Sequence, residues 1–390
     1  MSKLQLEHTA QSIALVANTS WSIYNFRLGV IKALISARHK IYAVAPRDDY
    51  SDKLTAAGVT YLPIKIKAHS TSPIEDLKTL FRLRSIYKKH QFDLVIHYTI
   101  KMNLYGSLAA RLLHIKNISV VTGLGRTFQF SGITQYLIKS VYKLSCHACS
   151  DLWFLNTEDR DRFVIEGLTK LKNTFILPSE GVNTYRFKGT PQYAKNRIIT
   201  RFLFAGRLLK DKGILEFVEA AKQLSVLERK VKFEVVGFVN PNNSMSVSLA
   251  DLEGWQKKGW INYLGSHEDI RPFINRADCI VFPSYYQEGV SRILLEAASM
   301  SRPIITTDHV GCRDVVDHMK NGMLIPVKSV DHLVQACRLF LNLPTEERLQ
   351  MGFKGREMVK ERFDERRIID VYFERIFKVK EENQLSNKAS

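Results

Sequence analysis

Two glutamates in the second half of the chain stand where acidic side chains could bind the hydroxyls of a sugar. They lie in PSYYQEGVSRILLEAASMSRPIITT, residues 283–307, as Glu288 and Glu296. Gly289 separates the first glutamate from VSRILLEAASM, whose apolar spacing and good helix formers predict a helix. We therefore expect Glu288 just before a helix N-terminus and Glu296 inside the helix, roughly 9 Å farther along its axis at about 1.5 Å per residue.

The helix start between these glutamates would favour an anion. Its free N–H groups and its dipole suit a diphosphate, and a carboxylate on each side accepts hydrogen bonds from hydroxyls. A ligand with a sugar at one end, a diphosphate in the middle and a ribose at the other fits this layout. The alternative is purely structural: Glu296 as a partly buried helix residue, and Glu288 as a charge that stabilises the helix dipole.

A second candidate cluster lies in RFLFAGRLLKDKGILEF, residues 201–217. The pattern predicts a strand, a loop and a helix that opens after Gly213. Arg207, Lys210 and Lys212 fall in the loop, at the end of a strand where a parallel sheet presents its ligand site. Arg binds phosphate oxygens as a fork and Lys as a point charge. The loop is thus a candidate diphosphate site, with an ordinary solvated basic loop as the alternative.

Elements that could position these groups alternate along the chain. Short β-rich runs such as IALVAN, DLVIHY, RFLFAG and CIVFPS are separated by helical patterns, which predicts an α/β fold with parallel sheets. The alternation stops in the polar stretch GVNTYRFKGTPQYAKNR, residues 181–197, and then resumes. The chain is also too long for one core of ordinary size, so we expect two doubly wound, Rossmann-like domains.

Charge is distributed unevenly along the 390 residues. Residues 1–200 carry 28 Lys and Arg against 13 Asp and Glu, or +15, whereas residues 201–390 carry 29 against 26, or +3, of the total of +18. Residues 101–150 contain six Lys or Arg and no acidic side chain. Such a surface attracts the phosphates of nucleic acid, of anionic lipid or of a charged substrate. Nucleic-acid binding is the less favoured, because no zinc-finger spacing or RNA-binding aromatic strand is present.

The remaining composition favours a cytoplasmic protein without metal. No run of about 18 apolar residues and no secretion signal is present, and five cysteines do not form a disulfide framework. The DRD at residues 159–161 lies in a helical pattern, where alternate residues do not share a face. The lone CxxC of Cys146 and Cys149 has no second pair. The sequence therefore predicts no metal site and no cofactor.

Several longer segments resemble one family of enzymes. GRLLKDKG, INYLGSHEDI, ADCIVFPSYYQEGVSRILLEAASMSRPIITTDHVGCRDVV and NGMLIPV are similar to the C-terminal half of the retaining glycosyltransferases of family 4, which have the GT-B architecture of two Rossmann-like domains facing a cleft. In the first half, WSIYNFRL, HYTIKMNLYGSLAARLL and VVTGLGRTF resemble the bacterial members that add N-acetylhexosamines, especially N-acetylgalactosamine, to polyprenyl-diphosphate-linked sugars.

The resemblance implies three domain assignments and a function. Residues 1–185 would form an acceptor-binding domain, residues 186–362 a nucleotide-sugar-binding domain, and residues 363–390 a helix that crosses back to the first domain, with a tail. The enzyme would move an N-acetylhexosamine, with N-acetylgalactosamine favoured, from a UDP-sugar to a polyprenyl-diphosphate-linked saccharide, for a capsule, an O-antigen or a glycoprotein glycan. The alternatives are a family 4 hexosyltransferase with another donor or acceptor, a catalytically silent relative, and a basic nucleic-acid-binding protein.

The resemblance also implies roles for particular residues. Glu288 would hold the hydroxyls of the donor sugar and Glu296 the ribose, while Arg207 and Lys212 would grip the diphosphate. His97, at the end of a strand, would contact the donor sugar, unless it is a histidine satisfied within the strand end. The other expected substrate-binding residues are Gly206, Gly289, Val290, Ser291, Arg292, Ile293, Asn25, Arg27, Lys101 and Arg126. Transfer on one face of the sugar requires no side-chain nucleophile, and none is nominated.

Two further expectations concern the first half. Many family members have a glycine pair after the first strand, whereas this chain reads NTSWSIYNFR there, with Gly29 only farther on. An approach of that backbone to the diphosphate is therefore in doubt. The stretch QFSGITQYLIKSVYKL, residues 129–144, is a candidate amphipathic helix for docking on anionic lipid at the inner face of the plasma membrane. An ordinary core-facing helix with a basic outer side is the alternative.

Overall fold

The computed structural model of the chain describes residues 9–66, 72–124, 132–189, 199–227 and 230–386. The chain divides into two compact units, one formed by residues 1–181 with 365–390 and the other by residues 182–364. The sequence placed the corresponding boundaries at 185/186 and 362/363. The chain thus leaves unit 1 after Gly181 and re-enters it at Glu365.

Unit 1 is built on a parallel sheet with the strand order β3-β2-β1-β4-β5-β6-β7. The strands are β1 (Ser12–Val16), β2 (Lys40–Ala45), β3 (Thr60–Pro63), β4 (Leu94–Tyr98), β5 (Lys116–Val121), β6 (Asp151–Phe154) and β7 (Thr174–Ile176). Strand β4 is buried along its whole length, as expected for a strand covered on both faces. The order reverses between the neighbours β1 and β4, and such a switch point opens a ligand crevice at the carboxyl ends of the strands.

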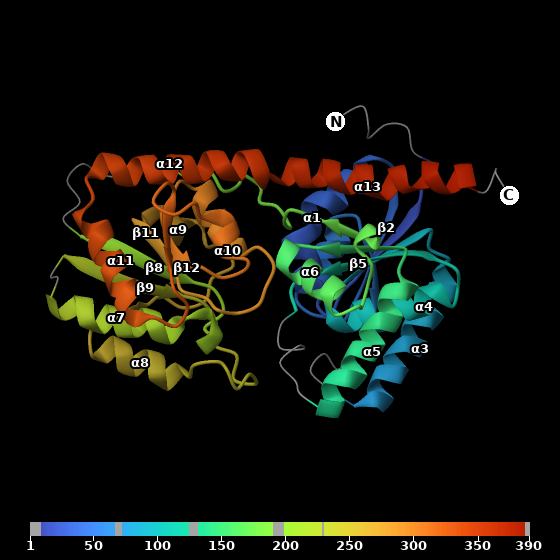
Figure 1. Cartoon of the computed structure of the whole chain (residues 1–390), viewed down its shortest axis with the longest axis horizontal. Helices are drawn as coiled ribbons and strands as arrows, with labels where there is room; N and C mark the ends of the chain where they lie inside the picture. Colours follow the sequence, from blue (N-terminus) through green and yellow to red (C-terminus); the bar gives the residue numbers. More distant parts are fainter. Residues whose placement is uncertain (1–8, 67–71, 125–131, 190–198, 228–229, 387–390) are drawn as a thin grey trace. The chain divides into compact units, whose positions relative to one another are not determined.

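Helices cover both faces of this sheet (Figure 1). They are α1 (Ser20–Ser36), α2 (Ser51–Ala56), α3 (Pro73–His90), the π-helix η2 (Met102–Gly106), α4 (Ser107–Arg111), α5 (Gly132–Ala148), α6 (Thr157–Ile165), the short 3-10 turn η4 (Leu171–Asn173) and α13 (Glu365–Ser386). Helices α1 and α13 contact each other, and both contribute to the core on one face. Helices α3 and α4 contribute to the core on the other.

Unit 2 repeats this plan with the strand order β10-β9-β8-β11-β12-β13. Its strands, all parallel, are β8 (Thr200–Ala205), β9 (Val231–Val236), β10 (Asn262–Tyr263), β11 (Cys279–Phe282), β12 (Ile304–Thr307) and β13 (Gly322–Ile325). Its helices are α7 (Ile214–Leu227), α8 (Leu249–Lys257), α9 (Arg271–Arg276), α10 (Arg292–Ser299), α11 (Val330–Asn342) and α12 (Thr345–Arg362), with the 3-10 turns η5 (Lys210–Lys212) and η6 (Arg313–Val315). The order reverses between β8 and β11, which places the second crevice at their carboxyl ends.

Two layers of helices enclose the sheet of unit 2 (Figure 1). Helix α7 packs with α11, and α10 packs with α12. One apolar core runs through the whole unit. The predicted α/β class with two parallel-sheet domains is therefore confirmed. Among the helices of the described ranges, none is both long and apolar enough to cross a membrane.

Candidate active site

In unit 2, the loop after β8 packs closely against the segment that follows β11. Gly213 has a φ of +81°, and a Cβ on it would stand 2.2 Å from the carbonyl oxygen of Pro283, so only glycine fits. The Tyr285 amide donates to the carbonyl of Asp211 at 3.0 Å. These contacts hold the turn η5, with Lys212 at its end, against the segment that follows β11.

Lys212 and Glu288 form an ion pair in the crevice of unit 2. The Lys212 side chain is only 5% exposed and that of Glu288 is 22% exposed. Burial lowers the pKa of Lys212, and the Glu288 carboxylate opposes that shift. A buried ammonium is stable only beside negative charge, so this position suits a phosphate oxygen as well as a carboxylate.

An aromatic ring brings Arg207 into the same cluster. The Lys212 ammonium lies 4.5 Å from the centre of the Tyr286 ring, and the Arg207 guanidinium lies 5.4 Å from it. Both are cation–π distances. The structure thus gathers three of the expected residues, Arg207, Lys212 and Glu288, around one tyrosine that the sequence analysis did not single out, although it lies two residues before Glu288.

The loop between Glu288 and α10 is fixed by the segment after β12. Gly311 has a φ of +78°, and a Cβ there would stand 2.0 Å from the Gly289 carbonyl oxygen. The Ser291 amide donates to the Gly311 carbonyl at 2.8 Å. The Ser291 amide is therefore already engaged and is not available to a phosphate. The amides of Arg292 and Ile293, in the first turn of α10, have no acceptor within the helix.

Glu296 lies one turn into α10 and pairs with Arg292, whose Nε is 2.9 Å from its Oε1. Burial raises the pKa of Glu296, while the neighbouring Arg292 opposes the rise. The charge of Arg186 also lowers that pKa. Arg186 belongs to the polar stretch that the sequence analysis interpreted only as a domain boundary, and its position near Glu296 depends on the fold rather than on any local pattern.

His97 in unit 1 has no solvent exposure. Its Nε2 lies 2.9 Å from the Tyr87 hydroxyl, and a Cβ added to Gly106 would stand 2.4 Å from its ring. Burial lowers the pKa of His97 to about 3, so the ring is neutral near pH 7. The expected contact with a donor sugar is not open in this conformation, because the π-helix η2 covers the ring. A π-helix often marks a functional site, and here it follows Thr99, whose φ is +74°.

Arg27, expected to bind substrate, is buried and structural in this conformation. It is 3% exposed, forms an ion pair with Glu180 and lies 4.0 Å above the centre of the Tyr98 ring. The Asn25 side chain donates to the Trp21 carbonyl at 2.9 Å. The structure therefore ties Arg27 to the end of β4 and to the segment that leaves unit 1.

The other two expected residues of unit 1 are Lys101 and Arg126. Lys101 donates to Asp76 at 2.7 Å, so its ammonium already has an anionic partner. Arg126 lies outside the described residues.

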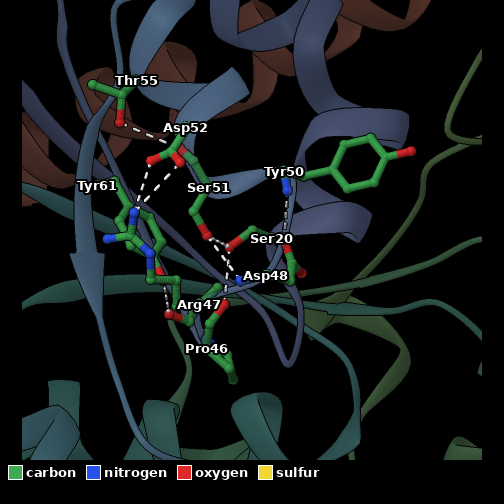
Figure 2. Close-up of polar contacts among 10 residues, drawn as sticks. Ser20, Pro46, Arg47, Asp48, Tyr50, Ser51, Asp52, Thr55 and Tyr61 are labelled. Atoms are coloured by element: carbon green, nitrogen blue, oxygen red, sulfur yellow. Dashed lines mark hydrogen bonds and ion pairs between the residues drawn. The ribbon is translucent and has the colours of Figure 1, made fainter.

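The loop without the glycine pair is held by hydroxyls and one carboxylate, as Figure 2 shows. The Ser20 hydroxyl donates to the Pro46 carbonyl at 3.0 Å and lies 3.1 Å from the Ser51 hydroxyl. The Trp21 amide donates to Asp48 at 3.0 Å, and the Ser22 amide donates to Thr19 at 3.2 Å. These first-turn amides of α1 are engaged, and the Asp48 carboxylate would repel a phosphate. This helix start is therefore poorly suited to a diphosphate.

Two family models match the chain. Residues 191–358 match the model for glycosyl transferases group 1, and residues 12–156 match the model for glycosyl transferase 4-like proteins. The first match lies wholly within unit 2 and includes Arg207, Lys212, Glu288, Arg292 and Glu296.

Curated relatives resemble the chain over most of its length. The N,N'-diacetylbacillosaminyl-diphospho-undecaprenol alpha-1,3-N-acetylgalactosaminyltransferase of Campylobacter jejuni is 28% identical over 355 residues, which cover 87% of this chain and 91% of the relative. The UDP-Gal:alpha-D-GlcNAc-diphosphoundecaprenol alpha-1,3-galactosyltransferase of Escherichia coli is 26% identical over 308 residues, which cover 75% of this chain and 76% of the relative.

Solved structures share the fold. A glycosyltransferase from Rickettsia africae superposes with a TM-score of 0.77 at 17% identity, covering 95% of this chain and 100% of that one. HepE from Anabaena, solved in complex with UDP, gives a TM-score of 0.77 at 14% identity, covering 94% and 99%. Both matching models describe glycosyltransferases, one in each half of the chain, and the relatives that match most of its length are glycosyltransferases, so the chain is a hexosyltransferase with the GT-B fold.

Proposed function

We propose that this enzyme transfers N-acetylgalactosamine from a UDP-sugar to a polyprenyl-diphosphate-linked saccharide during synthesis of a surface glycan, with retention at the anomeric carbon. The observation that carries the proposal is the cluster of Arg207, Lys212 and Glu288 at the β8–β11 switch point, beside the Arg292–Glu296 pair. The activities for which the Campylobacter and Escherichia relatives are named support the lipid-linked acceptor, and the first of them supports the donor sugar.

The donor would bind by replacing internal ion pairs. Lys212 and Arg207 are the cations for its diphosphate, and the first-turn amides of α10 add donors at a helix N-terminus. Glu288 would then accept hydrogen bonds from the hydroxyls of the sugar, and Glu296 from those of the ribose. Gly206, Gly289 and Val290 would form the backbone wall beside them.

The transfer step needs one bond made and one broken on the same face of the donor sugar. The acceptor hydroxyl oxygen forms a bond to the anomeric carbon as the bond from that carbon to the phosphate oxygen breaks. The hydroxyl proton passes to the departing phosphate, which leaves as UDP. Arg207 and Lys212 stabilise the negative charge that develops on this leaving group, and the step requires no nucleophilic side chain.

The acceptor would lie in the crevice of unit 1, outside the carboxyl ends of β1 and β4. Its polyprenyl chain would remain in the bilayer, so the enzyme would work as a peripheral protein on the inner face of the plasma membrane. The basic excess of the N-terminal half supports contact with an anionic lipid surface.

Calorimetric titration with UDP, GDP and ADP in EDTA tests the donor site directly. We expect binding of UDP alone. In Glu296→Ala the affinity for UDP should fall about 10- to 100-fold, because hydrogen bonds to a charged group are lost. Glu288→Ala should bind free UDP nearly as well as the unaltered enzyme but lose transfer. Glu219, half-buried on α7 and paired only with Lys222 and Gln223 of its own helix among the contacts described, provides the control variant Glu219→Ala, which should change neither.

Transfer assays can then identify the donor sugar and the acceptor. Transfer would be measured with a panel of UDP-sugars and lipid-linked acceptors, and the anomeric configuration of the product read by NMR. An inverted product would contradict the retaining step. Absence of binding to any of the three nucleotides would contradict the proposed donor site.

A further inference from the structure

Helix α3 of unit 1 presents an exposed apolar stripe. Ile74, Leu77 and Phe81 are 67%, 55% and 57% exposed, and their spacing places them on one face of the helix. The buried face of the same helix contains Leu83 and Tyr87. Single exposed apolar side chains are ordinary, whereas three on one helix face indicate a surface that another body covers.

Cations border this stripe. From residue 77 to residue 90 the helix sequence LKTLFRLRSIYKKH has five Lys or Arg and no Asp or Glu. Lys88 is exposed, as is Lys78, which pairs with Glu75 at 2.9 Å, and both lysines fall on the same face as the stripe by helical spacing. An apolar stripe flanked by lysines fits the surface of an anionic bilayer, which takes up apolar side chains and attracts cations. A second copy of the same face would bring like charges together.

The helix that bears the stripe is also tied to the crevice of unit 1. In its first turn, the Asp76 carboxylate accepts hydrogen bonds from Lys101 at 2.7 Å and from the Tyr105 hydroxyl at 2.8 Å. Both of these residues follow β4, at the switch point. Farther along, Tyr87 reaches His97 within β4. The stripe therefore begins at the end of α3 that borders the expected acceptor site.

We propose that the Ile74, Leu77 and Phe81 face of α3 inserts into the surface of an anionic bilayer and holds the acceptor crevice at the membrane. This inference rests on the proposed function, because a polyprenyl-linked acceptor gives the crevice a reason to lie there. It assigns the main membrane contact to α3 rather than to residues 129–144. Of that stretch, residues 129–131 and the side chains of residues 132–135 and 137 lie outside the described part of the chain.

Vesicle flotation of the full chain tests the assignment. The variant Ile74→Ser/Leu77→Ser/Phe81→Ser would be compared with the unaltered protein on vesicles of phosphatidylglycerol with phosphatidylcholine, and on phosphatidylcholine alone. The control Ile165→Ser/Leu171→Ser removes two other apolar side chains of unit 1, which are 84% and 56% exposed. We expect the α3 variant to lose about tenfold or more of its partition onto the anionic vesicles, and the control to lose none.

The unaltered protein should also float less as salt rises, since its attraction to the lipid is partly electrostatic. Single Phe81→Ser should give a smaller loss in the same direction. Flotation of the α3 variant equal to that of the unaltered protein would overturn the proposal. A change from dimer to monomer in ultracentrifugation without a change in flotation would overturn it too, because the stripe would then be an interface between copies of the chain.

Two further measurements separate this inference from the proposed function. The α3 variant should bind UDP normally and should transfer sugar normally to a water-soluble, short-chain acceptor, while losing transfer to a long-chain acceptor in vesicles. Failure of UDP binding in the unaltered protein would count against the proposed function alone. Intact UDP binding with unchanged transfer to the long-chain acceptor would count against the membrane face of α3 alone.

Discussion

Glu296 is a buried carboxyl group whose ionised form is disfavoured by the fold. Burial raises its pKa above the ordinary value, and the neighbouring Arg292 offsets only part of the rise. A raised carboxyl pKa means that the folded state favours the protonated form. Stability from this group is therefore full below the pKa of the unfolded chain and is lost as pH rises through the folded pKa. The ionised carboxylate is therefore a destabilising feature of the folded state, one that ligand binding would use.

The substitution Glu296→Gln should have opposite effects on stability and on the affinity for UDP. Glu296→Gln removes the buried charge but keeps the shape of the side chain, so we expect the Tm at pH 7 to rise by a few degrees. The affinity for UDP should fall about tenfold or more, because an ionised acceptor is lost. Scanning calorimetry and isothermal titration would measure the two. A fall in both Tm and affinity would show that Glu296 supports the fold rather than the ligand.

At the residue scale, the sequence was most informative where the site is local. Arg207 and Lys212 lie in one predicted loop and Glu288 lies just before a predicted helix, and the structure does bring these three together. Arg27 shows where sequence reasoning ends. Its partner Glu180 is 153 residues away, and no pattern in WSIYNFRL indicates that the guanidinium is buried.

At the element scale, α3 and β4 are joined by a buried histidine. His97 has a pKa of about 3 against an ordinary value of 6.5, because burial disfavours its charged form. Because the pKa of this base is lower in the folded state than in the unfolded state, His97 favours the folded state fully above its unfolded pKa, and this stabilisation is lost as the pH falls. We therefore expect the free energy of unfolding to fall by about 1.4 kcal/mol per pH unit, from this group alone, between pH 6.5 and 3.

His97→Gln should remove that slope, since glutamine does not titrate. Urea unfolding at several pH values would give the slope for each variant, and the difference between them isolates His97 from other titrating groups. His114, exposed after α4, provides the control His114→Gln, which should keep the slope of the unaltered chain. Equal slopes in the unaltered protein and His97→Gln would mean that His97 is open to water, as a direct contact with the donor sugar requires.

Regular elements were the easier part to predict. The strands could be predicted from short apolar runs and the helices from the helical spacing of apolar residues, because both patterns depend on neighbours in the chain. The π-helix η2 was not predicted, since the one extra residue per turn leaves little trace in HYTIKMNLYG. It matters all the same, because Gly106 at its end lies directly against the His97 ring.

At the scale of the whole molecule, the last helix belongs to the core of the first unit. In α13, the side chains of Ile368, Tyr372, Phe373, Ile376 and Phe377 are all at most 4% exposed and pack in the core of unit 1. The polar stretch at 181–197 indicated a domain boundary. No local pattern, however, tells which core the C-terminal helix completes, because that depends on tertiary packing.

Removal of residues 365–390 should therefore unfold unit 1 while unit 2 remains folded. Five buried apolar side chains contribute roughly 8–15 kcal/mol at about 1.5–3 kcal/mol each, which matches the whole stability of a typical domain. The truncated chain also loses the Arg375–Asp151 ion pair of 2.7 Å. Scanning calorimetry should show one transition fewer than in the full chain, and hydrogen exchange should show protection in unit 2 only.

UDP binding by this truncated chain tells where the nucleotide is held. The residues assigned to the donor, from Gly206 to Glu296, all lie in unit 2, which has its own continuous core. We therefore expect the truncated chain to bind UDP, although it transfers no sugar. Loss of UDP affinity on removing 365–390, with unit 2 still protected from exchange, would mean that unit 1 supplies contacts to the nucleotide.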